Sequence, residues 1–510
     1  MRCRRERRWP AVLAGAVLLC AAGAAAPADA IAPLLQPCRL DGLAQAARCG
    51  VVKRALDPAR PQGVQIEVHF AVVPALARRK ADDPVFFFAG GPGQSAIELA
   101  GLLASRYARL NQRRDLVFVD QRGTGRSAPL KCADDDERAV LQPLAERIDE
   151  ARQQARLREC RLALQALPQG DLRFYTTELA TGDVLAVRQA LGGARINAIG
   201  ASYGSRAVLD LLRQQPQAVR RAVLDGVVPP DMRLADSAAR DNQAALDALL
   251  DACAAEAACA HRHPALRAQW RSLLAALPQP VALPHPVSGR TETVLLRRDT
   301  LLSLVRAPLY APLLASALPA AIAEAADGRW APLAALAGSL GGSAGTVYTG
   351  MHLSVVCSED LGPVPLPADS AGDAPDAAAG NDFGATFAQQ YRQACADWPR
   401  GAVSAAFFSL PPLPAAGAPV WLLSGGLDPV TPPRHGQRVA QALGPRARHI
   451  VVPQLGHGVT ALGCLRDAVV RFIDTADDAG ALAGDAGCAA AVPRPLAFVP
   501  PGAAADGASR

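Results

Sequence analysis

The sequence predicts an α/β fold in which a mostly parallel sheet carries helices on both faces and is interrupted by a large helical insertion. Short apolar runs rich in β-branched and aromatic residues, typical of buried strands, alternate with segments of helical periodicity. That alternation stops after residue 230 and resumes only at residue 419. The pattern favours one core in two parts over three consecutive domains, although 510 residues would suffice for three.

The predicted strands fall into two groups that flank the insertion. They lie at residues 64–73, 84–88, 116–120, 196–200 and 222–225 in the first group, and at 419–423 and 449–452 in the second. Helical patterns occur at 183–191 and 206–213, and within the insertion at 235–256 and 313–326, while 367–382 is a low-complexity loop. The resulting division is an export signal at 1–30, a first core part at 31–230, the mainly helical insertion, or cap, at 231–416, a second core part at 417–488 and a Pro/Ala/Gly-rich tail at 489–510.

The N-terminus has the organisation of a cleaved export signal. Residues 1–8 are rich in arginine, and residues 11–26 form a continuous apolar run. The run is short for the roughly 20 residues of a membrane-spanning helix, so an uncleaved anchor is the weaker alternative. Ala28-Asp29-Ala30 supplies the small-x-small pattern that signal peptidase reads. We expect cleavage after Ala30, a secreted or periplasmic protein, and no stable membrane span.

Charge and cysteine usage exclude several classes of partner. The formal net charge is +6, and no basic stripe with interleaved aromatic residues occurs, so nucleic acid is not an expected partner. Two of the twelve cysteines precede residue 30, and the even number that remains favours disulfides in an exported chain. The remaining cysteines form neighbouring couples: Cys38 and Cys49, Cys132 and Cys160, Cys253 and Cys259, Cys357 and Cys395, Cys464 and Cys488. The alternative is a metal site, but the sequence has no C-x-x-C or H-E-x-x-H, so we expect no metal and no cofactor.

Two segments match the G-x-S-x-G pattern of a nucleophilic serine, at residues 200–204 and 341–345. The pattern has chemical meaning only where a strand turns sharply into a helix, because that strained turn exposes the serine Oγ above the sheet. Ser202 follows the strand predicted at 196–200 and precedes a helical pattern, whereas Ser343 lies between glycine-rich runs. Ser202 is therefore the predicted nucleophile.

A serine hydroxyl needs a base to remove its proton, and the base needs an acid to orient it. In folds of this kind the acid and the histidine follow the serine in that order, each on a loop after a later strand. Asp428 and His457 each follow one of the two predicted strands of the second core part. His435 falls in a helical stretch and His449 begins a strand, so both fit this pattern less well. The alternative role for Asp428 is to cap the helix that follows it.

The oxyanion hole of such a site consists of backbone N–H groups aimed at the developing charge. One is expected from Tyr203, the residue after the nucleophile. The other is expected from the loop AGGPG at 89–93, where glycines allow the backbone to approach a substrate closely. Pro92 has no N–H, which leaves Gly91 or Gly90, and we predict Gly91. The alternative is that the loop is only a tight turn.

Together these segments resemble a known family. The secreted tripeptidyl aminopeptidase-like branch of the prolyl aminopeptidase family of α/β-hydrolases has similar sequences at GGPGQS (90–95), DQRGTGRS (120–127), GASYGS (200–205), VRRAVLDGVVPPD (219–231) and GGLDPVTP (425–432). The resemblance implies an α/β-hydrolase fold and hydrolysis of peptides from a free N-terminus, with Ser202, Asp428 and His457 as the catalytic triad. Ala89 departs from the prolyl aminopeptidases, which carry a histidine before GGPG, and this departure favours the tripeptidyl branch.

The resemblance also implies supporting and substrate-binding residues. Asp120 and Arg122 match family positions and are expected to brace the active-site loops; the alternative, a buried ion pair, gives them the same role. Exopeptidases of this family hold the substrate α-amino group with carboxylates from the insertion, and the segment CSED at 357–360 resembles the family's cysteine-acid segment. Glu359 is therefore the predicted substrate-binding residue. The alternative is a solvated acid beside a disulfide.

The predicted protein is an exported serine aminopeptidase that releases N-terminal residues or short di- or tripeptides through an acyl-enzyme. Its expected partners are peptide substrates with a free N-terminus. A carboxylesterase with the same triad is the first alternative, because fold and triad do not determine the leaving group. A non-catalytic binding protein on this fold is a more remote alternative, since such proteins normally lack a triad member.

Overall fold

The computed structural model describes residues 35–339, 345–362 and 381–499, and its main sheet has the strand order β1-β2-β3-β5-β4-β6-β7-β10-β11. The strands are β1 (Gln36–Cys38), β2 (Ala47–Ala55), β3 (Gln65–Val73), β4 (Val85–Phe88), β5 (Leu116–Val119), β6 (Ile196–Ala201), β7 (Val219–Asp225), β10 (Val420–Gly425) and β11 (Ala447–Val452). The pairs β1–β2, β2–β3 and β3–β5 are antiparallel, and every pair from β5 to β11 is parallel. The predicted mostly parallel sheet is confirmed.

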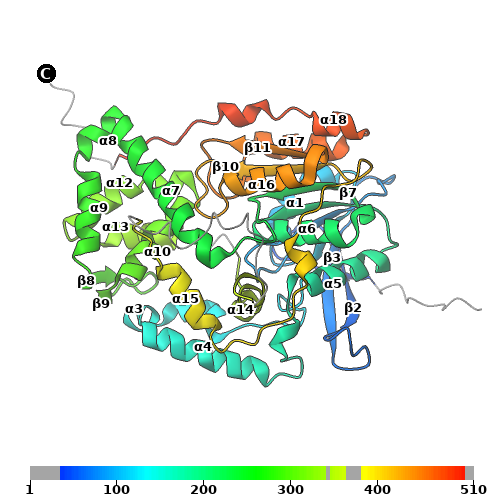
Figure 1. Ribbon diagram of the computed structural model, residues 1–510, viewed down its shortest axis with the longest axis horizontal. Helices are drawn as coiled ribbons and strands as arrows, with labels where there is room; N and C mark the ends of the chain where they lie inside the picture. The colour runs from blue at the N-terminus through cyan, green and yellow to red at the C-terminus, as the bar shows by residue number, and fades with distance from the viewer. Residues whose placement is uncertain (1–34, 340–344, 363–380, 500–510) are drawn as a thin grey trace, which may run out of the picture. The chain divides into compact units, whose positions relative to one another are not determined.

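Helices cover both faces of this sheet, as the sequence predicts (Figure 1). Those of the two core parts are α1 (Ala100–Arg106), α2 (Ala108–Asn111), α3 (Leu144–Arg147), α4 (Glu150–Gln165), α5 (Thr177–Ala190), α6 (Tyr203–Gln214), α16 (Pro433–Leu443), α17 (Gly463–Asp474) and α18 (Asp478–Leu482). Phe86 and Phe88 of β4 pack in one buried layer with α5 and α6, and Val85 and Phe87 pack in the opposite layer with α1 and α17. Because both faces are covered, β4 is a continuous apolar run.

The segment between β7 and β10 is mainly helical and has a hydrophobic core of its own. Its elements are α7 (Leu234–Ala255), α8 (Ala257–Arg262), α9 (Leu266–Ala275), β8 (Gln279–Pro284), β9 (Thr291–Leu296), α10 (Arg298–Leu309), α11 (Pro312–Ala315), α12 (Leu318–Ala326), α13 (Ala331–Gly338), α14 (Thr349–Val355), a π-helical turn at Val356–Asp360, and α15 (Thr386–Cys395). Side chains of α7, α9, α10, α12, α13, β8 and β9 form one buried apolar cluster, distinct from the two layers on the sheet. We refer to this segment as the insertion.

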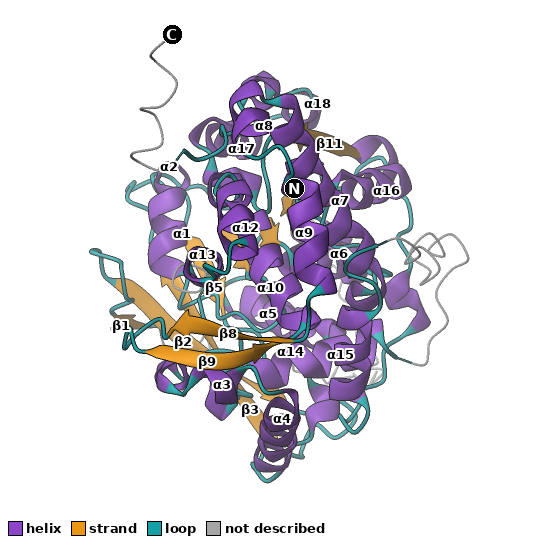
Figure 2. Cartoon of the chain, turned by 90° about the vertical axis from the view of Figure 1, so that its left-hand side faces the viewer, coloured by secondary structure: helices purple, strands orange, loops and turns teal. Residues whose placement is uncertain are grey.

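One part of the insertion differs from the sequence prediction, which placed no strand between residues 231 and 416. The strands β8 and β9 pair antiparallel and form a separate two-stranded ribbon (Figure 2). The sequence does not predict β8 as a strand because it contains Pro280 and Pro284. Both prolines are exposed, while Val281 and Leu283 are buried. A proline is tolerated here because a two-stranded ribbon leaves each strand with a free edge.

Two smaller differences concern unpredicted strands and a divided helix. The strands β1 and β2, which extend the sheet beyond β3, were not predicted. The helix predicted at 313–326 is divided into α11 and α12, because Pro319 takes the position near a helix start that suits proline. The predicted loop at 367–382 lies mostly outside the described residues, and so does Ser343 of the second G-x-S-x-G segment.

Disulfides join the cysteines in the neighbouring couples noted in the sequence. Five occur in the described part of the chain: Cys38–Cys49, Cys132–Cys160, Cys253–Cys259, Cys357–Cys395 and Cys464–Cys488. Cys253–Cys259 links α7 to α8, and Cys357–Cys395 links the π-helical turn to α15. The expectation of structural disulfides is confirmed.

Candidate active site

Ser202 lies in a sharp turn between β6 and α6. Its φ of 54° and ψ of −126° are unfavourable for a residue with a side chain. Its N–H donates to the carbonyl oxygen of Asp225 at 2.8 Å, which holds the turn against the neighbouring strand. A Cβ on Gly200 would lie 2.3 Å from the carbonyl oxygen of Gly204, and a Cβ on Gly204 would lie 2.0 Å from that of Phe88. The turn therefore requires both glycines of the G-x-S-x-G pattern.

Asp428 and His457 are hydrogen-bonded to each other at the ends of two adjacent parallel strands. Asp428 follows β10 and His457 follows β11, and His457 Nδ1 lies 2.7 Å from Asp428 Oδ2. Asp428 Oδ1 also accepts from the N–H groups of Val430 and Thr431, both at 2.9 Å, and Oδ2 accepts from the Thr431 hydroxyl at 2.7 Å. Asp428 thus closes its own turn and orients His457. The alternative role of a helix cap is wrong, because α16 begins after Pro432 and has no side-chain cap.

The charges of this pair stabilise each other. Burial would raise the pKa of Asp428, but the attraction of His457 and the hydrogen bonds from His457 and Thr431 outweigh burial, and the pKa of Asp428 is lowered. Burial would lower the pKa of His457, but the attraction and hydrogen bond of Asp428 raise it above its ordinary value. Asp428 therefore stays ionised at neutral pH and stabilises the cation that His457 becomes when it accepts a proton.

The other two histidines of the second core part are engaged elsewhere. His435 is buried on α16, with Nε2 3.0 Å from Asp241 Oδ2. His449 lies on β11, with Nε2 2.9 Å from the hydroxyl of Ser424. Of the three, His457 lines the cavity that also contains Ser202.

Asp225, at the end of β7, was not singled out from the sequence. Its carbonyl oxygen accepts the N–H of Ser202, and its buried carboxylate accepts from Val459 N at 2.8 Å, Thr460 N at 3.0 Å and Thr460 Oγ1 at 2.6 Å. One residue thus ties the turn of Ser202 to the segment after His457. The available signal was an acidic residue at the end of an apolar strand, where the active-site loops of such sheets lie.

The loop after β4 lies against Ser202. A Cβ on Gly90 would be 3.3 Å from Ser202 Cβ, and Gly91 has a φ of 107°, which favours glycine. Gly91, Ser202, Tyr203 and His457 line one cavity. Tyr203 is also the first residue of α6, and N–H groups in the first turn of a helix have no partner within the helix. The residues predicted for the oxyanion hole are therefore next to the predicted nucleophile.

Two buried polar pairs brace the active-site loops. Asp120 Oδ1 accepts from Ser95 Oγ at 2.6 Å and from Ile97 N at 3.0 Å, which joins the loop after β5 to the loop after β4. Burial raises the pKa of Asp120 to about 6, although these hydrogen bonds oppose the rise. Arg122 forms a bidentate pair with Asp183 of α5, at 2.7 and 2.8 Å. Asp120 and Arg122 thus brace different neighbours.

The cavity at Ser202 has a volume of about 290 Å³ and walls from both the core and the insertion. The insertion contributes Asn242 of α7, Arg306 of α10, Tyr310 at the end of α10, His352 of α14, Asp360 of the π-helical turn and Tyr391 of α15, among others. Tyr310 also accepts the backbone N–H of His457 with its carbonyl oxygen at 2.9 Å. No group of three His, Cys, Asp or Glu side chains that could hold a metal ion occurs within the described residues.

Glu359 and Asp360 share the guanidinium of Arg206. Arg206 Nη1 donates to Asp360 Oδ1 at 2.7 Å and lies 3.4 Å from Glu359 Oε2. Glu359 also accepts from Thr177 N at 2.7 Å and Thr177 Oγ1 at 2.9 Å, and it is buried, so the alternative of a solvated acid is wrong. Burial raises the pKa of Glu359 to about 7. Asp360 lines the cavity, whereas Glu359 lies beside it.

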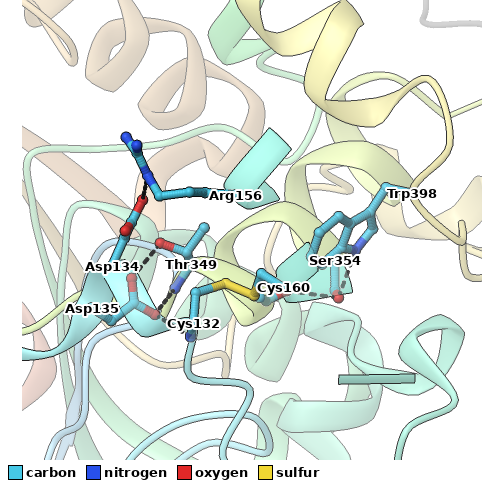
Figure 3. The surroundings of a disulfide bond; sticks show 9 residues. Cys132, Asp134, Asp135, Arg156, Cys160, Thr349, Ser354 and Trp398 are labelled. Carbon is cyan, nitrogen blue, oxygen red and sulfur yellow. Dashed lines mark hydrogen bonds and ion pairs between the residues drawn. A yellow bond between two sulfur atoms is a disulfide. The ribbon is translucent and has the colours of Figure 1, made fainter. Parts of the chain in front are cut away.

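The helix that leads to Asp360 is anchored to the first core part. Figure 3 shows the start of α14 beside the disulfide Cys132–Cys160. There Thr349 donates its N–H to Asp135 Oδ2 at 2.8 Å and its hydroxyl to Asp135 Oδ1. A loop of the core thus fixes the position of a cavity wall that belongs to the insertion.

Comparisons with known proteins agree with this topology. Residues 83–287 match the family model described as alpha/beta hydrolase fold, and residues 380–480 match the model described as TAP-like protein. The chain therefore has an α/β-hydrolase fold, and it is similar to TAP-like proteins over residues 380–480. A tripeptidyl aminopeptidase of Streptomyces coelicolor is 30% identical to this chain over 234 residues, which are 44% of this chain and 42% of that protein.

A second relative covers more of both chains. Serine protease Hip1 of Mycobacterium tuberculosis is 28% identical to this chain over 308 residues, which are 57% of this chain and 58% of that protein. The chain therefore spans about half the length of the curated relatives that it matches.

Proposed function

We propose that this α/β-hydrolase is a serine peptidase that releases N-terminal residues or short di- or tripeptides from peptides. The observation that carries the proposal is that Ser202, on its strained turn, and the hydrogen-bonded pair His457–Asp428 meet at one cavity. The names of the two relatives, a tripeptidyl aminopeptidase and a serine protease, support a peptide bond as the target.

In the proposed reaction, Ser202 Oγ attacks the scissile carbonyl carbon while His457 Nε2 accepts its proton. Asp428 keeps the imidazole oriented through Nδ1 and stabilises its cationic form. The N–H groups of Gly91 and Tyr203 stabilise the oxyanion of the tetrahedral intermediate. His457 then gives its proton to the leaving amine, and a water molecule that it activates hydrolyses the acyl-enzyme.

The acidic end of the cavity is the proposed site for the substrate α-amino group. Arg206 pairs with both Glu359 and Asp360, so two carboxylates share one guanidinium. A substrate ammonium beside Asp360 supplies a second positive charge and favours the ionised form of Glu359, whose pKa burial raises to about 7. In this proposal Asp360 contacts the substrate ammonium, and Glu359, which does not line the cavity, contributes its negative charge without contact.

We also propose export through residues 1–30, with cleavage after Ala30, and keep the division 31–230, 231–416, 417–488 and 489–510 as the proposed domain organisation. The disulfides support export, because such bonds persist in oxidising compartments. Among the described residues, no helix is long and apolar enough to cross a membrane. N-terminal sequencing of the exported protein should begin at Ile31, and an intact Met1 would contradict the proposed cleavage.

A substrate panel on the mature protein tests the proposed activity. The panel contains prolyl, dipeptidyl and tripeptidyl anilides, each with a free and a blocked N-terminus, beside p-nitrophenyl esters. The free anilides should be cleaved and the blocked ones spared, because blocking removes the ammonium that pairs with Asp360. Hydrolysis of esters alone would indicate a carboxylesterase, equal cleavage of blocked and free anilides would exclude an aminopeptidase, and no hydrolysis at all would favour a binding protein.

A further inference from the structure

The cavity wall that the insertion contributes contains a cation that forms no ion pair within the described part of the chain. Arg306, on α10, lines the same cavity as Ser202. Its Nη2 donates to the hydroxyl of Tyr310 at 3.2 Å, and its guanidinium lies over the rings of Phe387, 4.8 Å from the centroid, and Tyr310, 5.6 Å from the centroid. Across residues 35–339, 345–362 and 381–499, no carboxylate forms an ion pair with this guanidinium.

The other ionisable groups on the insertion's side of the cavity already have partners. Asp360 is paired with Arg206 at 2.7 Å. His352 Nε2 lies 2.7 Å from the Tyr391 hydroxyl, and burial lowers the pKa of His352, so its ring is neutral at pH 7. Arg306 is therefore the charge on this wall that a bound anion would neutralise.

The arrangement of Arg306 suits a carboxylate. A guanidinium presents five N–H donors in a planar fork, and the contact with Tyr310 uses one of them. The aromatic rings of Phe387 and Tyr310 hold the fork in place and shield one side of it from water. A carboxylate that reaches the fork forms charge-assisted, bidentate hydrogen bonds, which are stronger here than in open solvent.

A second polar group in the same cavity has one atom that forms no hydrogen bond with the described residues. Asn242 of α7 lines the cavity and is 2% exposed. Its Nδ2 donates to the carbonyl oxygen of Ala238 at 2.5 Å, while its Oδ1 has no hydrogen-bond partner in the described structure. Buried amide oxygens are normally bonded, and a peptide N–H would satisfy this one. The Oδ1 of Asn242 can accept a peptide N–H, and the guanidinium of Arg306 can bind a carboxylate. Together they complement a short peptide.

We propose that Arg306 binds a carboxylate of the peptide substrate and thereby sets the enzyme's preference for peptides that carry one. The inference rests on the proposed function, because it concerns the same cavity. Two sources supply the same group, namely the C-terminal carboxylate of a short peptide and the side chain of an aspartate or glutamate. With the α-amino group held at Asp360, a carboxylate at Arg306 favours peptides whose two charges span the cavity over peptides that lack the carboxylate.

The test uses matched peptides, all with a free N-terminus, that differ by one group. One pair differs by a C-terminal acid or amide, and the other by an internal glutamate or glutamine. Wild type should prefer the carboxylate member of at least one pair by about tenfold in kcat/KM, and Arg306→Gln should lower kcat/KM for that member by about ten- to hundredfold. For the neutral member, Arg306→Gln should change kcat/KM by less than about twofold, because the contact is specific for charge.

Two further α10 variants serve as controls. Arg306→Lys keeps the charge without the fork and should retain part of the preference. Arg298→Gln removes an exposed arginine from the same helix, one that contacts the carbonyl oxygen of Asp382 and does not line the cavity, and it should leave both pairs unchanged. The pair that responds identifies the source of the carboxylate.

Three results would overturn the proposal. The first is an equal kcat/KM for both members of both pairs in wild type, which requires no variant. The second is an equal loss for carboxylate and neutral members in Arg306→Gln, which would assign the residue to a peptide carbonyl or to packing. If wild type hydrolyses no peptide, the proposed function fails separately, and the same peptide pairs are then compared by calorimetric binding. In that case the third overturning result is that wild type binds the carboxylate and the neutral member of each pair with equal affinity.

Discussion

The sheet and the insertion supply different parts of one cavity and hold them by different means. The groups proposed for bond cleavage lie in loops that follow strands: Ser202 after β6, Asp428 after β10, His457 after β11 and Gly91 after β4. Each is positioned by backbone hydrogen bonds or by glycines that permit close approach. The backbone of the core thus fixes the positions of the atoms proposed to react.

The insertion holds its side of the cavity through side-chain contacts. Arg306 is placed by aromatic rings, Asp360 by Arg206, and the π-helical turn by its disulfide to α15. Such contacts change readily with sequence, whereas the ends of paired strands do not. In the proposed function, this difference means that the core sets the reaction and the insertion sets which peptides undergo it.

The proposed division of roles between the core and the insertion is wrong if the core residues do not control the chemical step. Ser202→Ala should lower kcat by about 10⁶, as removal of a nucleophile does in other serine hydrolases. Ser343→Ala, in the other G-x-S-x-G segment, is the matched control and should retain full activity. Initial rates on a free tripeptidyl anilide measure both, and activity that survives in Ser202→Ala would disprove the site.

The core residues were accessible from sequence because their constraints are local. Ser202 and His457 each lie within a few residues of an apolar strand, and glycines next to them mark the turns. Asp225 was missed because its role depends on contacts with Val459 and Thr460, 234 and 235 residues further along the chain. Arg306 was missed because its place in the cavity depends on how the helices of the insertion pack, which no local pattern records.

A smaller but diagnostic effect is expected when the acid of the core pair is neutralised. Asp428→Asn should lower kcat by about 10⁴, because the amide neither fixes the imidazole tautomer nor stabilises the cation. In wild type, kcat/KM should fall as the pH drops through the raised pKa of His457. In Asp428→Asn, the carboxylate no longer opposes the effect of burial, so the pKa of His457 should fall. The acid limb of the kcat/KM profile should therefore move to lower pH. Profiles of kcat/KM from pH 5 to 9 measure this shift, and an unmoved limb would contradict the coupling.

Loosening the insertion should affect substrate binding more than chemistry. Replacing both Cys357 and Cys395 with serine should lower the free energy of unfolding by about 4 kcal/mol, given the 38-residue separation, and should raise KM more than it lowers kcat. The same change at Cys253 and Cys259, whose separation is 6, should cost about 2 kcal/mol and leave KM unchanged. Urea unfolding and steady-state kinetics measure the two effects. A fall in kcat without a rise in KM would contradict the division of roles.

The smallest expected effect isolates a single buried charge of the insertion. The folded-state pKa of Glu359 is about 7, above its ordinary value of 4.5, so the folded protein holds a proton that the unfolded chain has released. The stability that this proton contributes is fully present below pH 4.5 and is lost as the pH rises through 7. Glu359→Gln cannot titrate, so the melting temperature of wild type should fall relative to that of the variant over this range.

An acid on the surface separates this effect from general titration. Glu159→Gln, at an exposed position of α4, should keep a constant difference in melting temperature from wild type between pH 4.5 and 7.5. A constant difference for Glu359→Gln as well would show that Glu359 does not titrate in this range. If the difference does change, a free tripeptide should reduce it at pH 7, because the bound ammonium stabilises the ionised Glu359 that is otherwise costly. The same tripeptide with a blocked N-terminus should have no such effect, which would connect the charge of the insertion to the choice of substrate.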